Sequence, residues 1–445
     1  MSFTHEYNLY CETHGIPDRI ELMLCDLNSI LRGKWLPGDA WEKLEKGQVR
    51  LPLSTYAPNI MGQEVEETGM GIVVGDPDGI LKPVLGSLAP VPWAEGNVAQ
   101  VLVEMSDMDG VLSPYSPRGV LQNVLDRFAA HGWTPIVATE LEFYIFQKRD
   151  SPDDAPIPPQ RAPSAQNFDL EVLSRKDAIL SEIMSASAAQ NLATDTLIAE
   201  FGPGQFEINF HHTGDVQRAA ETALLFRRLV RQVVAKHGME ATFIAKPYAD
   251  DPGNGMHAHI SVVDQDGNNI FDAGGPVSGR LKNAVGGTLD TMRDLQAIFA
   301  PHMNSYRRFQ PNSFAPTAPN WGLDNRQAGV RLPEISGPAA RLEHRICGAD
   351  VNPYLALAAI LGGMLFGLEN KSDVPLPLDD TNAKPAENLG HDWLTAVERF
   401  AQSDAAKQIF GPAYQKVYAD VRRDEIAQLT RILTAVEYRA YLSRL

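Results

Sequence analysis

The chain has 445 residues, of which 44% are hydrophobic and 21% are charged, and its formal net charge is −17 at pH 7. This length and composition predict a soluble globular protein with two or three domains and a large buried core. An acidic chain without a basic cluster binds phosphate backbones poorly, so we expect no nucleic-acid partner.

The N-terminal segment MSFTHEYNLYCETHG has neither the basic region nor the apolar region of a signal peptide. The longest apolar run, residues 355–368, is too short to span a bilayer and contains glycines, so we expect a buried helix and no membrane partner. Cys11, Cys25 and Cys347 form no CxxC pair. This favours a reduced cytoplasmic location over a disulfide framework or a zinc–thiolate site.

In chain order, the first predicted elements are short strands. Between residues 20 and 105, apolar runs such as IELMLCDL and AQVLVEM alternate with Gly/Pro/Asp turns, which predicts a small, mainly β domain. Ser116 and Pro117 then begin an amphipathic helix that ends at Gly132. PIVATELEFYIF follows as a strand, and the proline-rich residues 151–165 predict a surface loop.

Later predicted elements alternate between helix and strand. Helices are predicted over residues 175–191, 216–237 and 279–299, with strands around Glu200, Phe243 and His259. From about residue 355 onward the chain is predicted to be mostly helical. The predicted class is α+β, with one domain over residues 1–112 and a larger one over residues 113–445.

Acids recur at alternate positions of the strand-like segments. Glu140 and Glu142 in ATELEFYIF face the same side of a strand, while Leu141 and Phe143 face the other. Two carboxylates on one face repel each other unless a cation or an arginine lies between them. A single pair of this kind is more often a solvated strand face, so the other segments decide the interpretation.

Three more segments repeat the pattern. EFGPGQFE carries Glu200 and Glu207 across a Gly-Pro-Gly turn, which predicts a hairpin that brings both acids to one end of a sheet. GNGMHAHIS places His257 and His259 on one strand face, and RLEHRI contributes Glu343. An oxygen-rich set with one or two imidazoles and no thiolate suits Mg²⁺ or Mn²⁺ better than zinc or copper.

Arginine is concentrated between residues 304 and 345, at Arg307, Arg308, Arg326, Arg331, Arg341 and Arg345. Arginine forks bind carboxylate and phosphate oxygens bidentately, and guanidinium groups opposite metal-holding carboxylates are what phosphoryl transfer requires. Surface ion pairs are the alternative, which fits Arg307 and stays open for Arg326. The chain has no GxxxxGK[ST] and no strand–GxGxxG–helix unit, which excludes a P-loop or a dinucleotide fingerprint.

Together, TELEFYIF, EFGPGQFEINF, AKPYADDPGNGMHAHISV, NSYRRF, APNWGLDNRQAGVRLP and RLEHRICGADVNPYLALAAI resemble, in order and spacing, the successive signatures of type I glutamine synthetases. DLNSILRGKWLP resembles the start of that family's N-terminal β-grasp domain. The resemblance covers essentially the whole chain from Ile20 onward. It implies a small β-grasp domain followed by a large catalytic domain built on an antiparallel sheet with helices.

The resemblance also implies roles for the residues that match the family's motifs. A first metal ion would be held by Glu142, Glu200 and Glu207, and a second by Glu140, His257 and Glu343. ATP-contacting positions would be His259, Ser261, Arg331 and Arg341, and glutamate-contacting positions would be Gly253, His257, Arg308 and Arg345. Arg326 falls at the phosphoryl-transfer position, and the residues expected to act in catalysis are Arg326, Arg308 and Glu343.

Members of this family make γ-glutamyl phosphate from glutamate and ATP, and an amine nitrogen then attacks it. The resemblance therefore implies ATP as co-substrate and Mg²⁺ or Mn²⁺ as cofactor, with two or three ions in each active site. It also implies a cytoplasmic homo-oligomer, a dodecamer of two hexameric rings with active sites between neighbouring subunits.

Two departures from the family pattern concern the nitrogen donor. Phe314 in PNSFAP stands where the family has a glutamate, and LPLSTYAPNIMG lacks the family's aspartate. Those two acids bind and deprotonate ammonium, and a small buried cation without acceptors costs several kcal/mol. A phenyl wall instead predicts a slot for an alkyl chain on the attacking amine, with Phe314 in the amine pocket.

GNNIF, GLDNR, EHRICGAD and ETGMG resemble the γ-glutamylputrescine (polyamine) synthetase branch of the family. We therefore predict an ATP-dependent ligase that joins the γ-carboxyl of glutamate to putrescine or another polyamine. One alternative keeps this chemistry with methylamine, ethanolamine, isopropylamine or ammonium as acceptor. Another is a catalytically silent structural member, against which the intact set of six metal-type ligands argues. The sequence names no base that deprotonates the amine.

Overall fold

Short apolar runs separated by turn residues form the N-terminal sheet of the computed structural model, which describes residues 2–158, 167–310 and 313–445. The strand order is β2-β1-β6-β4-β3, and β5 pairs with β6. The strands are β1 (Arg19–Cys25), β2 (Leu31–Pro37), β3 (Arg50–Pro52), β4 (Asp78–Pro83), β5 (Ala89–Pro90) and β6 (Val98–Ser106). β1 is antiparallel to β2 and parallel to β6.

Helix α1 (Phe3–His14) covers this sheet, because its aromatic side chains share a core with β1. Ser2 caps its first turn by accepting a hydrogen bond from the backbone N–H of His5. Phe3, Tyr7 and Tyr10 are buried in a cluster that also contains Ile20 of β1. A short helix, α2 (Glu42–Glu45), follows β2.

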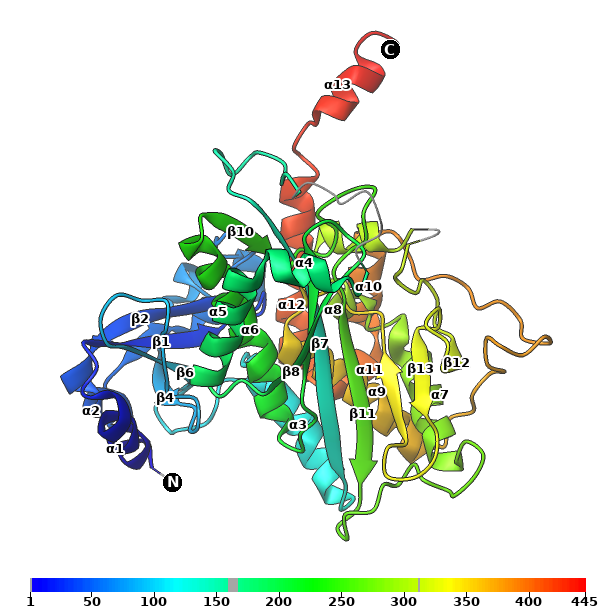
Figure 1. Cartoon of the computed structure of the whole chain (residues 1–445), viewed down its shortest axis with the longest axis horizontal. Coiled ribbons are helices and arrows are strands. Elements are labelled where there is room, and N and C mark those ends of the chain that lie inside the picture. The colour runs from blue at the N-terminus through cyan, green and yellow to red at the C-terminus, as the bar shows by residue number, and fades with distance from the viewer. Residues whose placement is uncertain (1, 159–166, 311–312) are drawn as a thin grey trace.

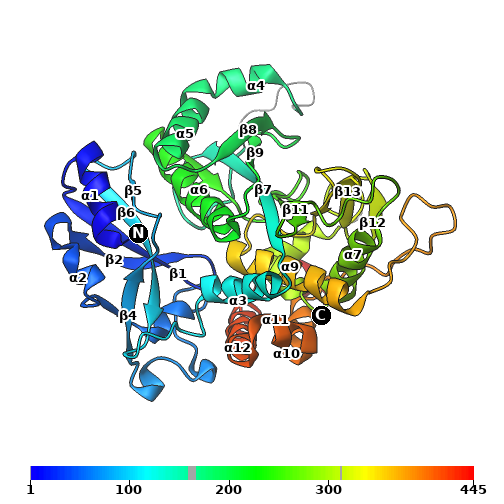
Figure 2. The ribbon, with the colours of Figure 1, turned by 90° about the horizontal axis from the view of Figure 1, so that it is seen from below.

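The second sheet lies beside the first, at the centre of the molecule (Figures 1 and 2). Its order among the described residues is β12-β13-β14-β11-β7-β9-β8, and β10 pairs with β7. The strands are β7 (Thr134–Gln147), β8 (Thr194–Ala199), β9 (Gln205–Phe210), β10 (Met239–Thr242), β11 (Met256–Val263), β12 (Trp321–Leu323), β13 (Val330–Glu334) and β14 (Arg341–His344). The predicted α+β class is therefore confirmed, and this sheet is antiparallel as predicted except at one edge, where β12 and β13 pair in parallel.

Helices cover one face of this sheet and fill the rest of the fold. The remaining helices are α3 (Pro117–Ala130), α4 (Leu170–Arg175), α5 (Asp177–Ala189), α6 (Val216–Lys236), α7 (Gly279–Met292), α8 (Gln296–Phe299), α9 (Pro353–Asn370), α10 (Trp393–Gln402), α11 (Asp404–Phe410), α12 (Pro412–Leu429) and α13 (Ala435–Tyr441). Phe143 of β7 is fully buried and packs edge-to-face on Phe226 of α6 at 6.0 Å. The helix side of β7 is therefore apolar, and its acids face the other way.

The predicted helices after Ser116, over 175–191 and over 216–237 are present within a few residues as α3, α5 and α6. The predicted helix over residues 279–299 is wrong in one respect, because α7 ends at Met292 and α8 is a separate turn. The backbone N–H of Gln296 bonds to the carbonyl of Arg293, a tighter turn than that of an α-helix. Part of the predicted loop over 151–165 lies outside the described residues, and residues 148–158 form no helix or strand.

Among the described residues, α9 is the one helix long and apolar enough to cross a membrane, but 78% of that window is buried inside the protein. Asn352 caps its first turn, and Leu357, Ala358 and Leu361 are fully buried. α9 is thus the central core helix, as the sequence predicts.

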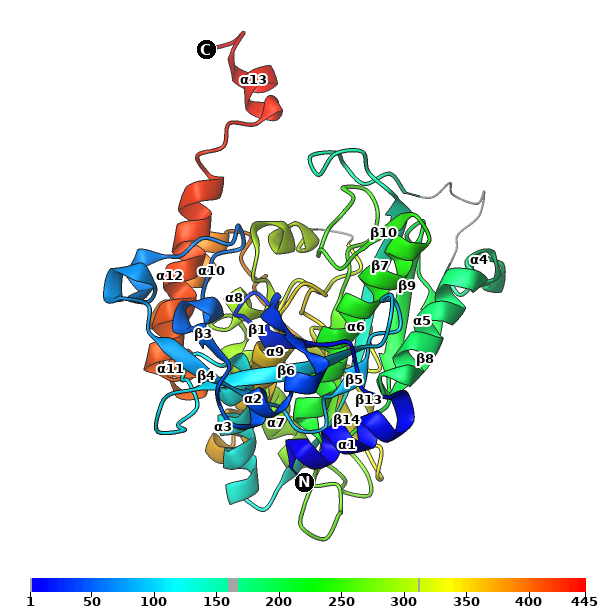
Figure 3. The ribbon, with the colours of Figure 1, turned by 90° about the vertical axis from the view of Figure 1, so that its left-hand side faces the viewer.

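The N-terminal sheet is joined to the C-terminal helices through buried polar contacts. Arg422 of α12 donates a hydrogen bond to Asn28, and Asn352 donates to the carbonyl of Asp26 at 3.0 Å. α13 extends away from the body of the molecule (Figures 1 and 3). The division into domains at residue 112 stays a prediction.

Candidate active site

Acidic and imidazole side chains from four neighbouring strands meet on the face of the larger sheet opposite the helices. The strand register sets this arrangement, since residues that face each other across adjacent strands lie on the same side of the sheet. The facing pairs are Glu140 and His257, Glu142 and Glu207, and His259 and Glu343. The alternation predicted from ATELEFYIF and MHAHIS is therefore what aligns the site.

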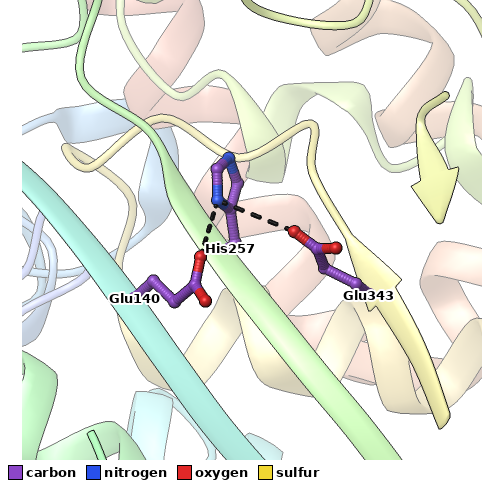
Figure 4. Close-up of side chains that lie close together, drawn as sticks. All are labelled: Glu140, His257 and Glu343. Carbon is purple, nitrogen blue, oxygen red and sulfur yellow. Dashed lines mark hydrogen bonds and ion pairs between the residues drawn. The ribbon is translucent and has the colours of Figure 1, made fainter. Parts of the chain in front are cut away.

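Glu140, His257 and Glu343 form the tightest group (Figure 4). His257 Nδ1 lies 3.0 Å from Glu140 Oε2 and 3.8 Å from Glu343 Oε1. His259 Nε2 lies 2.9 Å from the other Glu140 oxygen. One donor atom from each of Glu140, His257 and Glu343 lies within 4.8 Å of the others, a spacing that could hold a metal ion.

A second group shares His257 and adds Glu142 and Glu207, again with donor atoms within 4.8 Å of one another. Glu142 Oε2 accepts a 2.7 Å hydrogen bond from the backbone N–H of Gly255, which fixes its direction. Glu200, predicted as a ligand with Glu142 and Glu207, lies just after β8 and lines the same cavity. It is not part of either compact group.

The electrostatics of these carboxylates favour a bound cation. Burial, together with the charges of Glu140, Glu142 and Glu200, raises the pKa of Glu207 to about 9. Burial, followed by the charge of Glu142, raises the pKa of Glu200 to about 7. A divalent ion between the groups would offset the repulsion that adds to burial in raising both pKa values.

The pKa of Glu140 is shifted in the opposite direction. Burial opposes its ionisation, but the hydrogen bonds to His257 and His259 outweigh burial and lower its pKa well below the usual range. The candidate metal ligands of the two groups are carboxylate oxygens and an imidazole nitrogen, and none of them is a thiolate. This donor chemistry fits Mg²⁺ or Mn²⁺, as the sequence predicts.

Arginines surround Glu343 and close one side of the site. Arg331 Nη1 donates to Glu343 at 2.8 Å, and Arg345 donates to the other oxygen of the same carboxylate. Arg341 Nε lies 3.4 Å from His259 Nδ1. Burial, followed by the charges of His257, Arg345 and His259, leaves the pKa of Glu343 below its ordinary value, because the cations outweigh burial.

Arg308 is buried next to the two candidate metal-binding groups of side chains, so it is not a surface arginine. Its Nη1 donates to the carbonyl of Ile346 at 2.9 Å, and its Nε has no partner among the described residues. Gly253 packs directly against it, because a Cβ at this position would lie 2.8 Å from Arg308 Cγ and 2.5 Å from the carbonyl oxygen of Ala245. A side chain at residue 253 would therefore displace Arg308.

A cavity of about 1230 Å³ joins these parts. Most of the predicted site residues line it, namely Glu140, Glu142, Glu200, Glu207, Gly253, His257, Arg308, Phe314, Arg326, Arg331, Glu343 and Arg345. The predicted ATP-contacting residues His259, Ser261 and Arg341 do not line it. Ser261 shares the face of β11 with the two histidines but lies farther along the strand.

Three phenylalanine side chains line this cavity and are partly exposed, namely Phe168, Phe201 and Phe314, and two of them form a stacked pair. Phe314 is 62% exposed and Phe201 is 41% exposed, and their rings stack at 4.5 Å with an interplanar angle of 24°. Phe314 is predicted from the sequence, whereas Phe201 is not. Its position directly after Glu200 in the Gly-Pro-Gly hairpin is the signal that could have indicated it.

Known proteins resemble the chain over nearly all of its length. Residues 114–441 match the family model described as glutamine synthetase, catalytic domain. The chain is 38% identical to the γ-glutamylputrescine synthetase PuuA of Escherichia coli, over 98% of this chain and 94% of that protein. It is 31% identical to a glutamate–isopropylamine ligase of a Pseudomonas species, over 97% of this chain and 96% of that protein.

The chain is also 35% identical to a γ-glutamylethanolamide synthetase of Streptomyces coelicolor, over 81% of this chain and 78% of that protein. The solved structure of the GmaS/ADP complex superposes with a TM-score of 0.85 at 27% identity, covering 98% of this chain and 99% of that one. With the matched catalytic domain and the acidic, imidazole-containing site on its sheet, the chain belongs to the glutamine synthetase family.

Proposed function

We propose that the chain is an ATP-dependent ligase that joins the γ-carboxyl of glutamate to an organic amine, and that this amine is putrescine or another polyamine. The observation that carries the proposal is one cavity with two parts. One part is lined by the carboxylate–imidazole cluster and its arginines. The other part is lined by the stacked pair of Phe201 and Phe314. The first part suits phosphoryl transfer, and the second suits a carbon-bearing acceptor.

In the proposed reaction, a γ-carboxylate oxygen of glutamate attacks the γ-phosphorus of ATP, the bond to the bridging oxygen breaks, and ADP leaves. The amine nitrogen then attacks the acyl carbon of γ-glutamyl phosphate. The bond from that carbon to the phosphate oxygen breaks, phosphate leaves, and the nitrogen loses a proton. The products are a γ-glutamyl amide, ADP and phosphate.

The proposed roles follow the chemistry of each group. Glu142, Glu200 and Glu207 would hold one metal ion, and Glu140, His257 and Glu343 would hold a second. Bound Mg²⁺ or Mn²⁺ supplies positive charge to the phosphate oxygens. Arg326 neutralises charge on the transferred phosphoryl group, while Arg308 and Arg345 bind the glutamate anion in the buried part of the cavity.

The aromatic pair supports an amine that carries carbon. Ammonium needs hydrogen-bond acceptors on several sides, and neither Phe201 nor Phe314 offers one. The stacked rings instead provide an apolar surface along which methylene groups leave water, which is worth roughly 0.8 kcal/mol for each buried CH₂. Three relatives are named for organic-amine products or acceptors: γ-glutamylputrescine, γ-glutamylethanolamide and isopropylamine.

The test is an ADP-release assay with glutamate, ATP, Mg²⁺ or Mn²⁺ and a panel of amines. We expect kcat/KM for putrescine or spermidine to exceed that for ammonium by at least about 100-fold. Turnover with ammonium equal to that with putrescine would contradict the polyamine assignment. No ADP release with any amine would contradict the ligase itself.

The second candidate function is the same ligation with a smaller amine, which the ethanolamide and isopropylamine relatives favour. In that case ethanolamine or isopropylamine gives the highest kcat/KM in the panel. The two candidates differ in the length of the acceptor, so a single set of assays separates them.

We also propose that the protein is a cytoplasmic homo-oligomer, a dodecamer of two hexameric rings. Several exposed apolar side chains near the C-terminus support an interface there: Ile432, Leu433, Val436, Tyr441 and Leu442. Light scattering after gel filtration should give a mass twelve times that of the 48.8 kDa chain. A monomeric mass would contradict this assembly.

A further inference from the structure

The guanidinium of Arg326 has little to hold it in place. Arg326 is exposed, and among the described residues it makes no hydrogen bond or ion pair. It lines the active-site cavity from the turn that joins β12 to β13. The direction of this side chain therefore depends on the backbone of its turn, and a displacement of about 1 Å in a catalytic group can lower a rate 100-fold.

Asn325 organises that turn from within. Its Oδ1 accepts a 2.9 Å hydrogen bond from the backbone N–H of Gln327, and its carbonyl accepts from Ala328 at 3.2 Å. Asp324, the residue before it, has a left-handed backbone with φ of 48°, which is strained for a residue other than glycine. A strained turn keeps its shape only when its neighbours hold it.

Two neighbours hold the turn. Arg331 Nε donates to Asp324 Oδ1 at 3.0 Å, and the segment between α9 and α10, seen in orange at the right of Figure 1, bonds to residues 323 and 325. Asp379 Oδ2 accepts a 3.1 Å hydrogen bond from the backbone N–H of Leu323, and its Oδ1 accepts from Asn325 Nδ2. One carboxylate thus binds both the last residue of β12 and the residue that organises the turn. Charged acceptors make the stronger hydrogen bonds of this kind.

The same segment is fixed to β12 at two more points. The Trp321 indole donates to the carbonyl of Pro375 at 2.8 Å, and the backbone N–H of Leu378 donates to the carbonyl of Trp321 at 2.7 Å. Gly322 allows the close approach, because a Cβ there would lie 2.9 Å from Asp379 Oδ2. The carboxylate is therefore presented by an anchored backbone.

We propose that Asp379 is a positioning residue for Arg326: it holds the turn over residues 323–328 so that the guanidinium points into the active-site cavity. The proposal rests on the proposed function for the role of Arg326. Asp379 is exposed, so its contacts contribute little to global stability and act on the geometry of the turn.

The first test uses kinetics on the full-length protein. We expect Asp379→Ala to lower kcat about 10- to 100-fold, with KM for glutamate and for ATP changed by less than about threefold. Asp380→Ala is the matched control, since among the described residues the side chain of Asp380 accepts hydrogen bonds only from Asn382 of its own segment. An Asp379→Ala kcat equal to that of the wild type overturns the proposal.

The second test is a double-mutant cycle. If Asp379 acts through Arg326, Asp379→Ala has no further effect on kcat in an Arg326→Ala background. Effects that multiply would overturn the proposal. Combining Asp379→Asn with Asn325→Asp exchanges donor and acceptor and should restore at least half of the kcat lost in Asp379→Asn alone. Failure of this restoration counts against the direct contact.

A third measurement does not need activity. Hydrogen exchange of a peptide covering residues 322–328 should be at least about tenfold faster in Asp379→Ala than in the wild type, since the Leu323 amide loses its acceptor and the Asn325 side chain, which accepts from the Gln327 amide, loses its partner. Unchanged exchange overturns the proposal even if the enzyme turns over. Faster exchange in a protein that releases no ADP would leave the positioning contact standing and refute the proposed function.

Discussion

At the scale of single residues, we expect Phe314 to determine whether the amine pocket takes an organic amine or ammonium. Phe314→Glu places a carboxylate in the cavity beside Glu200 and provides the acceptor that ammonium needs. We expect kcat/KM for ammonium to rise about tenfold or more and that for putrescine to fall, measured by ADP release. Phe314→Leu is the control, because it keeps the amine pocket apolar and should keep the preference for organic amines. An unchanged order of kcat/KM values among the amines in Phe314→Glu would show that Phe314 does not determine amine specificity.

Glu207 shows the conflict between stability and metal binding. Its pKa is raised to about 9, chiefly by burial and then by the neighbouring carboxylates. Because the folded-state value is above the unfolded one, the stability that its proton provides is present below about pH 4.5 and is lost as the pH rises through 9. Without metal, Glu207→Gln should therefore unfold with a free energy about 1–3 kcal/mol higher than the wild type at pH 8, and the difference should shrink at pH 5.

Urea denaturation in EDTA at the two pH values measures this difference. The same variant should lose metal-dependent ADP release, because an amide is a poor ligand for a hard cation. Equal stability of the two proteins at pH 8 would mean that neither burial nor the neighbouring carboxylates disfavour the charged form of Glu207.

At the scale of elements, the β8–β9 hairpin carries two of the predicted metal ligands, and Gly202 sets its position. A Cβ at Gly202 would lie 1.9 Å from the Tyr144 hydroxyl oxygen on β7. Gly202→Ala should therefore push the hairpin away from β7, destabilise the fold by about 1–3 kcal/mol and lower metal affinity. Thermal unfolding and metal titration measure the two effects.

Tyr144→Phe removes the hydroxyl oxygen that the new methyl group would meet. The ring carbons Cζ and Cε1 would still lie 2.5 and 2.7 Å from that methyl group, so the double variant with Gly202→Ala should recover only part of the metal affinity lost in Gly202→Ala. Tyr144→Phe by itself is the control, because it loses the 2.8 Å hydrogen bond to the carbonyl of Pro252 but keeps the hairpin in place. No recovery in the double variant would mean that the hydroxyl oxygen is not the atom that displaces the hairpin.

The elements themselves were largely predictable, because their signals are local. Ser116 and Pro117 mark the start of α3, and the alternation of Glu140 and Glu142 with Leu141 gives both the strand and its polar face. The break between α7 and α8 was not predictable, since it depends on one backbone hydrogen bond at Arg293. The partnership of Phe201 with Phe314 was likewise invisible in the sequence, because it joins loops more than one hundred residues apart.

At the scale of the whole molecule, we expect a divalent ion to link distant parts of the chain. Its proposed ligands come from β7, the β8–β9 hairpin, β11 and β14, so its binding should favour the folded state alone. At a free metal concentration of 100 times Kd we expect about 2.7 kcal/mol of added stability. Thermal unfolding with Mg²⁺, with Mn²⁺ and with EDTA measures it, and Ca²⁺ serves as a comparison ion. A melting temperature that does not respond to Mg²⁺ or Mn²⁺ would contradict the metal site.

The two parts of the cavity are built from different kinds of element, strands for one and turns for the other. The groups that we propose to act on phosphate project mainly from paired strands, whose register the whole sheet enforces, whereas Phe201 and Phe314 belong to connecting turns. Replacing only those turns with the equivalent turns of a relative that uses another amine should therefore change which amine is preferred. The formation of γ-glutamyl phosphate from ATP and glutamate should be unaffected. The scaffold is in this sense a modular starting point for making γ-glutamyl amides of choice.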